Sequence, residues 1–179
     1  MDDYTGIDRV EKNIRTMTPS EVAKKYLGRT EKPGNAGFND ADFEIKMKQV
    51  GFVKGHAWCA YFAELVFKEA YPDKFRELDK LFSGSTIQTF RNFRDASYLI
   101  EHDPQPNTLV IWQSIKYGKP QPTGHAGIVV NVKSTWEFES IEGNTSDAKS
   151  REGYIVAKHE RKIFADVTNG LKVLGFIHL

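Results

Sequence analysis

Residues 58–70 carry apolar side chains at helical spacing, and this stretch constrains the fold more than any other. The series begins at Cys59, the only cysteine among the 179 residues, and continues at intervals of three and four to Ala70. Side chains at such intervals share one face of an α-helix. Gly55 lies just upstream and disfavours a helix, so we predict that the helix starts near residues 56–58 and buries Cys59 in its first turn.

Two interpretations of Cys59 follow from this position. A free cysteine on a buried face is commonly no more than a small hydrophobic residue. The start of a helix, however, presents unpaired N–H groups and a partial positive charge, which favour the thiolate form that a nucleophile needs. The helix by itself leaves both interpretations open.

The cysteine count also limits metal and redox chemistry. One cysteine excludes an internal disulfide and a CxxC site. His56 and Cys59 have a spacing that zinc ligands use, but no second pair of ligands accompanies them in the sequence. We therefore expect a protein without a metal ion or another cofactor.

The first half of the chain is rich in helix signals. Thr18 and Glu21 have the spacing of a capping box, and Gly28 ends the helix that they begin. Asp40 can cap a second helix. Together with residues 58–70, these signals predict a helical N-terminal half.

Strand signals dominate the second half. β-branched and aromatic runs predict strands at residues 108–112, 125–132, 136–141, 154–157 and 173–177. Residues 113–124, with two glycines and two prolines, predict a polar loop between the first two of these strands. Helices that precede strands are typical of an α+β fold, so we predict N-terminal helices packed on an antiparallel β-sheet.

Length and charge restrict the class of protein. We expect one compact domain at residues 19–179, with residues 1–18 as an N-terminal extension. The net charge of +1 provides no field that would attract nucleic acid or an anionic membrane. The sequence has no run of about 18 apolar residues that would predict a membrane span, and no secretory signal is visible, so we expect synthesis in the cytoplasm.

A histidine and two polar residues lie where they can act on Cys59. His125 opens a predicted strand, and an imidazole there can reach a thiol in the first turn of a packed helix and serve it as a base. A third polar group must then fix the imidazole ring. Glu142 and Asn144 stand two apart at the end of the next strand and would share one face, so either can take that role.

Three segments of the chain resemble the signature blocks of a known family. They are Trp58-Cys59-Ala60, Gly124-His125-Ala126-Gly127-Ile128-Val129-Val130 and Ile141-Glu142-Gly143-Asn144-Thr145. In this order they resemble the CHAP family, the cysteine, histidine-dependent amidohydrolases and peptidases of bacteria and their phages. Parts of residues 26–35 and the strand at 175–177 resemble the family as well, so the resemblance covers about residues 20–179. It implies a papain-like fold.

The resemblance also implies a role for each residue of the site. Cys59 is expected to be the nucleophile, and His125 the base and then the acid. Glu142 is expected to orient the imidazole, with Asn144 as a supporting polar group. Apart from the resemblance, the large ring of Trp58 is expected to line a groove that binds a sugar or peptide, with packing in the core as an equal alternative.

Hydrolysis of bacterial peptidoglycan is the function that this resemblance implies. The thiolate would attack an amide carbonyl of a wall peptide or glycopeptide, and water would release the acyl-enzyme. Such a protein would be made in a bacterial or phage-infected cytoplasm and would reach the cell wall by export or release. Two alternatives stay open: a related cysteine amidase or peptidase toxin with a substrate outside the wall, and an inactive module that holds a glycopeptide.

Overall fold

The computed structural model describes residues 16–146, 153–164 and 166–179. The helices come first, as α1 (Pro19–Lys25), α2 (Ala41–Gln49), α3 (Cys59–Ala70), the short 3₁₀ helix η1 (Pro72–Lys74), α4 (Phe75–Leu81) and α5 (Thr86–Asp95). The strands follow as β1 (Ile100–Glu101), β2 (Leu109–Lys116), β3 (Lys119–Ser134), β4 (Glu137–Thr145), β5 (Ile155–Lys162) and β6 (Gly170–Ile177). Residues 1–15, which hold most of the predicted N-terminal extension, lie outside the described residues.

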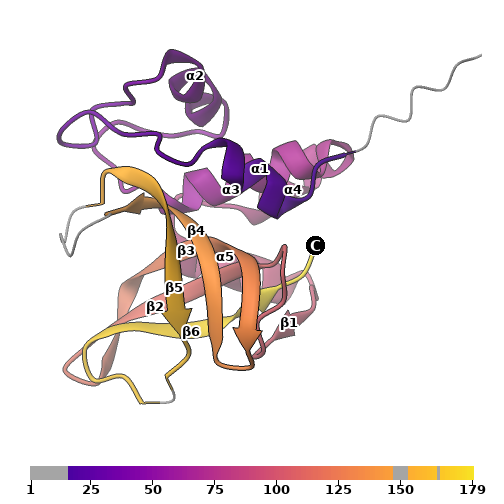
Figure 1. Cartoon of the computed structure of the whole chain (residues 1–179), viewed down its shortest axis with the longest axis vertical. Helices are drawn as coiled ribbons and strands as arrows, with labels where there is room; N and C mark the ends of the chain where they lie inside the picture. The colour runs from indigo at the N-terminus through magenta and orange to yellow at the C-terminus, as the bar shows by residue number, and fades with distance from the viewer. Residues whose placement is uncertain (1–15, 147–152, 165) are drawn as a thin grey trace, which may run out of the picture.

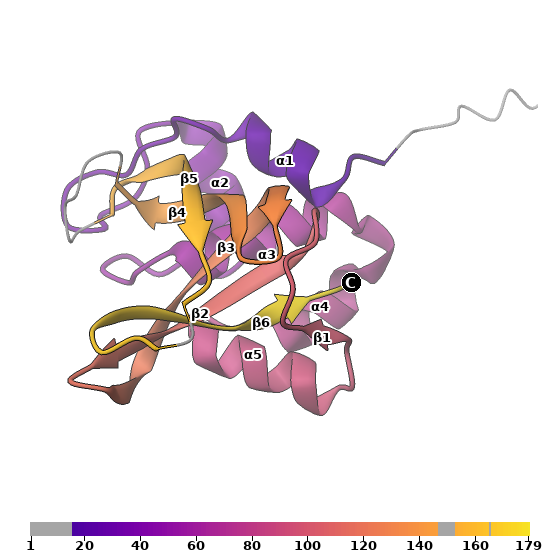
Figure 2. The same ribbon diagram turned by 60° about the horizontal axis from the view of Figure 1, so that its bottom comes forward.

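The six strands form one antiparallel sheet in the order β1-β6-β2-β3-β4-β5. The last strand in the chain, β6, therefore lies inside the sheet, between β1 and β2. Figure 1 shows α1 to α4 above a strongly curved sheet, and Figure 2 shows α5 beside β2. α3 packs against β3 and β4, and α5 packs against β2 and β3. This arrangement confirms the predicted α+β class with helices packed on an antiparallel sheet.

The first two helices are short and begin at their predicted caps. The Glu21 carboxylate accepts the main-chain N–H of Thr18 at 2.9 Å, and the Thr18 hydroxyl accepts that of Glu21, which completes the capping box of α1. Asp40 Oδ1 accepts the N–H of Phe43 at 2.8 Å and starts α2. These bonds satisfy N–H groups that a helix start leaves unpaired. Among the described residues, no helix has both the length and the apolar character that a membrane crossing needs.

α3 is buried on nearly all sides, and only Glu69 of its residues escapes burial. The helix lies between the sheet and the helices α1, α2 and α4, all of which it contacts. Two charged residues opposite its apolar stripe, Glu64 and Lys68, are therefore buried too. Lys68 Nζ lies 2.6 Å from a Glu64 oxygen and 2.7 Å from an Asp79 oxygen. A charge that cannot reach water needs such a partner. The apolar stripe in the sequence did not predict these ion pairs.

The predicted polar loop at residues 113–124 is wrong. β2 continues to Lys116 and β3 begins at Lys119, so a two-residue turn separates the strands. Tyr117 and Gly118 both have positive φ, 51° and 69°, and a turn of two left-handed residues matches the twist of a hairpin. The glycines and prolines of this stretch therefore form a tight turn and an extended hairpin rather than a long loop.

Each face of the sheet carries its own apolar cluster. The face toward the helices contributes Leu109, Ile111, Ala126, Ile128, Ile141, Val156 and Ile177 to the main core. The other face carries a smaller cluster of Val110, Trp112, Val129, Phe138 and Phe176. Since side chains alternate along a strand, neighbouring residues of one strand enter different clusters. The second face is thus packed separately from the helices.

Candidate active site

Cys59 is the first residue of α3 and is 6% exposed. The first main-chain hydrogen bond of the helix runs from the N–H of Phe62 to the carbonyl oxygen of Trp58, and no side chain caps the helix. An α-helix leaves the N–H groups of its first turn unused, so these groups surround the sulfur with partial positive charge. The structure confirms the predicted place of Cys59 in a first helical turn.

His125 lies on β3 and bridges Cys59 and Glu142. Its Nε2 lies 2.8 Å from Oε2 of Glu142. An ionised carboxylate only accepts hydrogen bonds, so Nε2 carries a proton and Nδ1 is the ring nitrogen left to interact with Cys59, which lines the same pocket. The predicted meeting of the sulfur and the imidazole is therefore present in the structure.

The charges around His125 favour its protonated form. Burial by itself lowers the pKa of this imidazole. Its charge interaction and hydrogen bond with Cys59, and then those with Glu142, outweigh burial and raise the pKa to about 10. An imidazolium and a thiolate stabilise each other in such a pair. With its pKa raised in this way, His125 already holds the proton that a leaving group needs.

Glu142 is fully buried and is held by several donors. Besides the imidazole of His125, the hydroxyl of Ser140 donates to Oε1 at 2.5 Å. Arg161 binds both carboxylate oxygens, with its Nε 2.7 Å from Oε1. Burial raises the pKa of Glu142, but the hydrogen bonds from Arg161 and His125 outweigh it and hold the pKa well below its ordinary value. Glu142 is thus a carboxylate fixed in one orientation against the imidazole.

Cys59, His125 and Asn144 line one pocket of about 400 Å³. Its other walls come from Glu31, Gly34, Asn35, Ala57, Gly124 and Gly153. A second hollow of about 230 Å³ shares His125 and Asn144 with the first and reaches Arg161 and Leu171. Within the described residues, no three His, Cys, Asp or Glu side chains form a group that could hold a metal ion. Cys59 and His125 thus lie in the wall of the first pocket, and His125 also borders the second.

A comparison with protein families connects this geometry with known proteins. The family model of the CHAP domain matches residues 51–144, which is more than half of the chain. The chain belongs to the CHAP family. The matched part of this CHAP domain contains Cys59, His125, Glu142 and Asn144, and CHAP domains are generally hydrolases of the amidase or peptidase type. No curated protein and no solved structure matched the chain.

Asn144 of the CHAP domain supports the start of α3. Its Oδ1 accepts the main-chain N–H of Trp58 at 2.6 Å, and its Nδ2 donates to the carbonyl oxygen of Gly153 at 2.9 Å. Its φ of 53° is a conformation that asparagine tolerates better than most residues. Of the two residues that the sequence left open as the partner of His125, Glu142 is the one that contacts the imidazole.

Trp58 does not line the pocket, so the expectation that it binds substrate is corrected. Its side chain is 0% exposed. It packs edge-on against Phe38 and Phe62, with ring centroids 5.1 and 6.4 Å away. The indole Nε1 donates to the Glu31 carboxylate, so its polar end is satisfied inside the protein. Packing is therefore the role that the structure supports for Trp58 in this CHAP domain.

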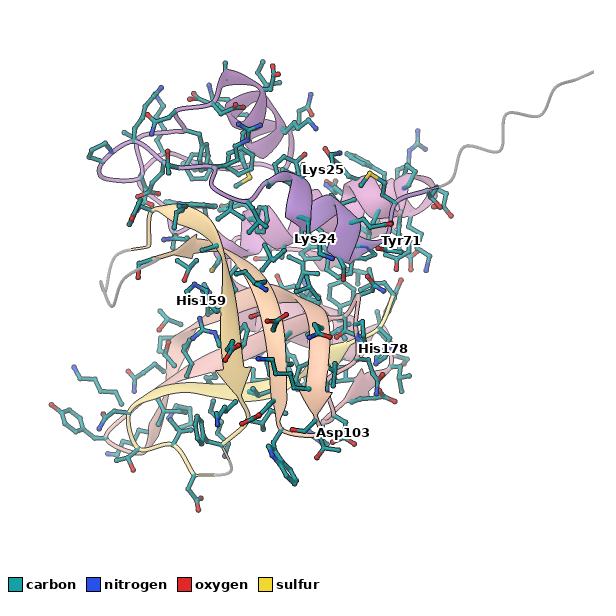
Figure 3. All side chains as sticks on the ribbon, in the orientation of Figure 1. Lys24, Lys25, Tyr71, Asp103, His159 and His178 are labelled. Atoms are coloured by element: carbon teal, nitrogen blue, oxygen red, sulfur yellow. The ribbon has the colours of Figure 1, made fainter. Side chains whose placement is uncertain are left out.

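Two donors to Glu142, Ser140 and Arg161, were not predicted from the sequence. The predicted strand at residues 154–157 was too short, because β5 of the CHAP domain continues to Lys162 and includes Arg161. The sequence signal that could have found Arg161 was the alternation of side chains along the strand. His159, labelled in Figure 3, and Arg161 stand two apart and share one face of β5. Ser140 likewise stands two positions before Glu142 on β4.

Two glycines of the CHAP domain allow the strands and the helix around the site to pack closely together. A Cβ on Gly127 would lie 2.8 Å from Cγ of Glu142. A Cβ on Gly143 would lie 2.6 Å from the Trp58 ring and 2.7 Å from Cβ of Phe62. Such contacts are too short for carbon atoms, so a larger residue would push Glu142 from β3 or α3 from β4. The glycines in the predicted motifs thus act through close packing.

Proposed function

We propose that this CHAP domain is a thiol hydrolase that cleaves an amide bond in the peptide part of bacterial peptidoglycan. The observation that carries the proposal is the contact between Cys59 and His125, with the buried carboxylate of Glu142 behind it. A nucleophile, an acid–base group and an orienting carboxylate are the parts that covalent amide hydrolysis requires. Membership of the CHAP family supports the reaction type.

The first half of the reaction forms an acyl-enzyme. The thiolate of Cys59 attacks the carbonyl carbon, a C–S bond forms, and the carbonyl oxygen takes up negative charge beside the first turn of α3. His125 gives its proton to the amide nitrogen, the C–N bond breaks, and the amine leaves. General acid–base catalysis of this kind contributes about 10²- to 10⁴-fold in rate.

The second half restores the thiolate. The neutral imidazole of His125 takes a proton from water while the water oxygen attacks the thioester carbonyl. The C–S bond then breaks, the carboxylic acid product leaves, and the imidazolium–thiolate pair forms again. Glu142 holds Nε2 of the imidazole throughout, so Nδ1 stays directed at the reacting groups.

The shape of the surface hollow supports a polymeric substrate. The two pockets share Gly124, His125, Asn144 and Gly153, and together they run from Glu31 past Cys59 to Leu171. An extended peptide or glycopeptide can lie along such a hollow with units on both sides of the scissile amide. Because CHAP domains are associated with peptidoglycan hydrolysis, we propose that the protein acts on the cell wall, after export or release from the cytoplasm.

Digestion of purified peptidoglycan tests the proposal. The wild-type protein should release soluble fragments, and Cys59→Ala should release none above background. Mass spectrometry of the fragments then identifies the bond that is cut. A circular dichroism spectrum shows that Cys59→Ala is folded. Equal release by the two proteins would reject the assignment.

The same proteins separate the two alternatives. If the wild type leaves peptidoglycan intact but hydrolyses glutathione or peptide amides, and Cys59→Ala does not, the protein is a thiol enzyme with another substrate. If it cuts none of these but binds muropeptides, and iodoacetamide alkylates Cys59 only after unfolding, the protein is a binding module.

A further inference from the structure

Arg161 makes a two-point contact with the carboxylate behind the imidazole. Its Nε lies 2.7 Å from Oε1 of Glu142, and a terminal guanidinium nitrogen donates to Oε2. Oε2 is also the atom that accepts the Nε2–H of His125. A guanidinium that binds both oxygens fixes the plane of a carboxylate as well as its position. The orientation of the imidazole therefore depends on Arg161 through Glu142.

Trp112 supports the guanidinium and the imidazole together. Cζ of Arg161 lies 5.5 Å from the centroid of the Trp112 ring. The imidazole centroid of His125 lies 5.7 Å from the same ring, with the two planes tilted by 33°. Trp112 is only 2% exposed and stacks on Phe138, so its ring is fixed in the smaller apolar cluster. The guanidinium of Arg161 and the imidazole of His125 therefore both lie against the buried ring of Trp112.

We propose that Arg161 is a positioning residue of the hydrolase: it fixes the Glu142 carboxylate and, through it, the His125 ring, with Trp112 as their common support. This inference rests on the proposed function. It goes beyond that function because it assigns part of the machinery to β5, which contributes no residue to the predicted set of Cys59, His125, Glu142 and Asn144.

The charges around Glu142 predict a measurable effect of removing Arg161. The groups that face the carboxylate are His125 from β3 and Arg161 from β5, and the charge of His125 is coupled to Cys59 on α3. His159 on β5 also interacts with Glu142 electrostatically. The hydrogen bonds from Arg161 are the largest cause that lowers the pKa of Glu142. Without Arg161, Glu142 should take up a proton at a higher pH, and the imidazolium should lose its anionic partner.

The experiment measures how fast iodoacetamide alkylates Cys59 as a function of pH. This readout reports the thiolate and needs no wall substrate. Arg161→Met removes the charge, and Arg161→Lys keeps it but cannot bind both oxygens in one plane. Lys162→Met is the matched control, because Lys162 is the next residue on β5 and forms an exposed ion pair with Glu137.

We expect Arg161→Met to lower the alkylation rate at pH 7, and kcat/KM on peptidoglycan fragments, by about 10- to 100-fold. The acid limb of the alkylation profile should move to higher pH. Arg161→Lys should keep that limb near its wild-type position but lower kcat. Lys162→Met should match the wild type. A purely structural role for Arg161 would lower the amount of folded protein without moving the limb.

The Glu142→Gln background tests whether Arg161 acts through Glu142. In that background Arg161→Met should change the alkylation rate no further, because the carboxylate that Arg161 positions is gone. The double variant also leaves no unpaired buried charge, so it serves if Arg161→Met alone does not fold. An additional loss in the double variant, or an unchanged profile in Arg161→Met, overturns the inference.

The two readouts keep this inference separate from the proposed function. If the wild type cuts no peptidoglycan but the alkylation rates follow the expected order, the proposed substrate is wrong and the role of Arg161 stands. If the wild type cuts peptidoglycan and Arg161→Met alkylates like the wild type, the proposed function stands and the role of Arg161 is wrong.

Discussion

The Oδ1 atom of Asn144 accepts the main-chain N–H of Trp58 at 2.6 Å, and this bond joins the end of β4 to the residue that precedes Cys59. The sulfur belongs to a helix and the imidazole to the sheet. Their distance from each other therefore depends on contacts that cross between the two layers. The Asn144 side chain is one such contact at the very start of α3.

Replacement of Asn144 should weaken both folding and catalysis. The φ of 53° suits glycine, so Asn144→Gly removes the two side-chain hydrogen bonds without straining the backbone. We expect it to lose about 1 kcal/mol of unfolding free energy per lost bond and to lower kcat/KM. Asn144→Ala should lose a further ~1 kcal/mol, because alanine is strained at this φ. Chemical denaturation and fragment release measure both effects, and an unchanged kcat/KM in Asn144→Gly would contradict the positioning role.

The imidazole of His125 should titrate at high pH as long as the sulfur is present. Cys59 is the largest contributor that raises the pKa of His125 to about 10, so Cys59→Ala should bring that pKa down toward its ordinary value. The imidazole would then lose its proton at a lower pH than in the wild type. NMR titration of the imidazole carbon-bound protons in the two proteins checks this. Equal pKa values in both would mean that sulfur and imidazole are not coupled.

Gly143→Ala should separate α3 from β4. The added Cβ would meet Trp58 at 2.6 Å and Phe62 at 2.7 Å, so we expect a loss of about 1–3 kcal/mol of unfolding free energy together with lower activity. Gly118→Ala is the comparison, since nothing lies within 4 Å of its Cβ and Gly118 lines neither pocket of the site. That variant should lose stability through its φ alone and keep its activity. Thermal unfolding and fragment release compare the two.

Replacement of Lys68 should lower the free energy of unfolding, because its partner Glu64 is buried. Lys68→Met leaves the 6% exposed Glu64 without its cation, and the expected loss is about 3–5 kcal/mol of unfolding free energy. The double variant Glu64→Leu, Lys68→Met should recover most of it. Lys48→Met breaks an exposed pair of the same spacing, with Glu44, and should change stability little. Denaturant titrations give the three values, and similar losses in both single variants would argue against a buried pair.

Local sequence patterns predicted those features of the site that depend on a single helix or strand. The apolar stripe and the upstream glycine predicted that α3 starts near residues 56–58. The helix that begins at Cys59 confirms this start. The motif around His125 gave the strand that carries the imidazole. Cys59 starts α3 as predicted, whereas His125 was expected to open its strand and instead lies inside β3, which begins at Lys119.

The contacts of Arg161 and Trp58 depend on relations between elements that one sequence does not fix. Arg161 reaches Glu142 because β4 and β5 pair in a register that places Ala157 opposite Glu142. A shift of one residue would turn Arg161 to the other face. Trp58 stands next to the nucleophile in sequence, but Phe38 and its neighbours close over the ring and bury it. Burial of an aromatic residue beside an active site depends on such distant segments.

The layered arrangement of the site has a consequence for protein synthesis. The sulfur leaves the ribosome well before the imidazole and the carboxylate, because α3 precedes β3 and β4 in the chain. β6, which follows β5 in the chain, must then insert between β1 and β2 to complete the sheet. A nascent chain thus carries a thiol that has neither of its activating partners until β3 and β4 have been translated.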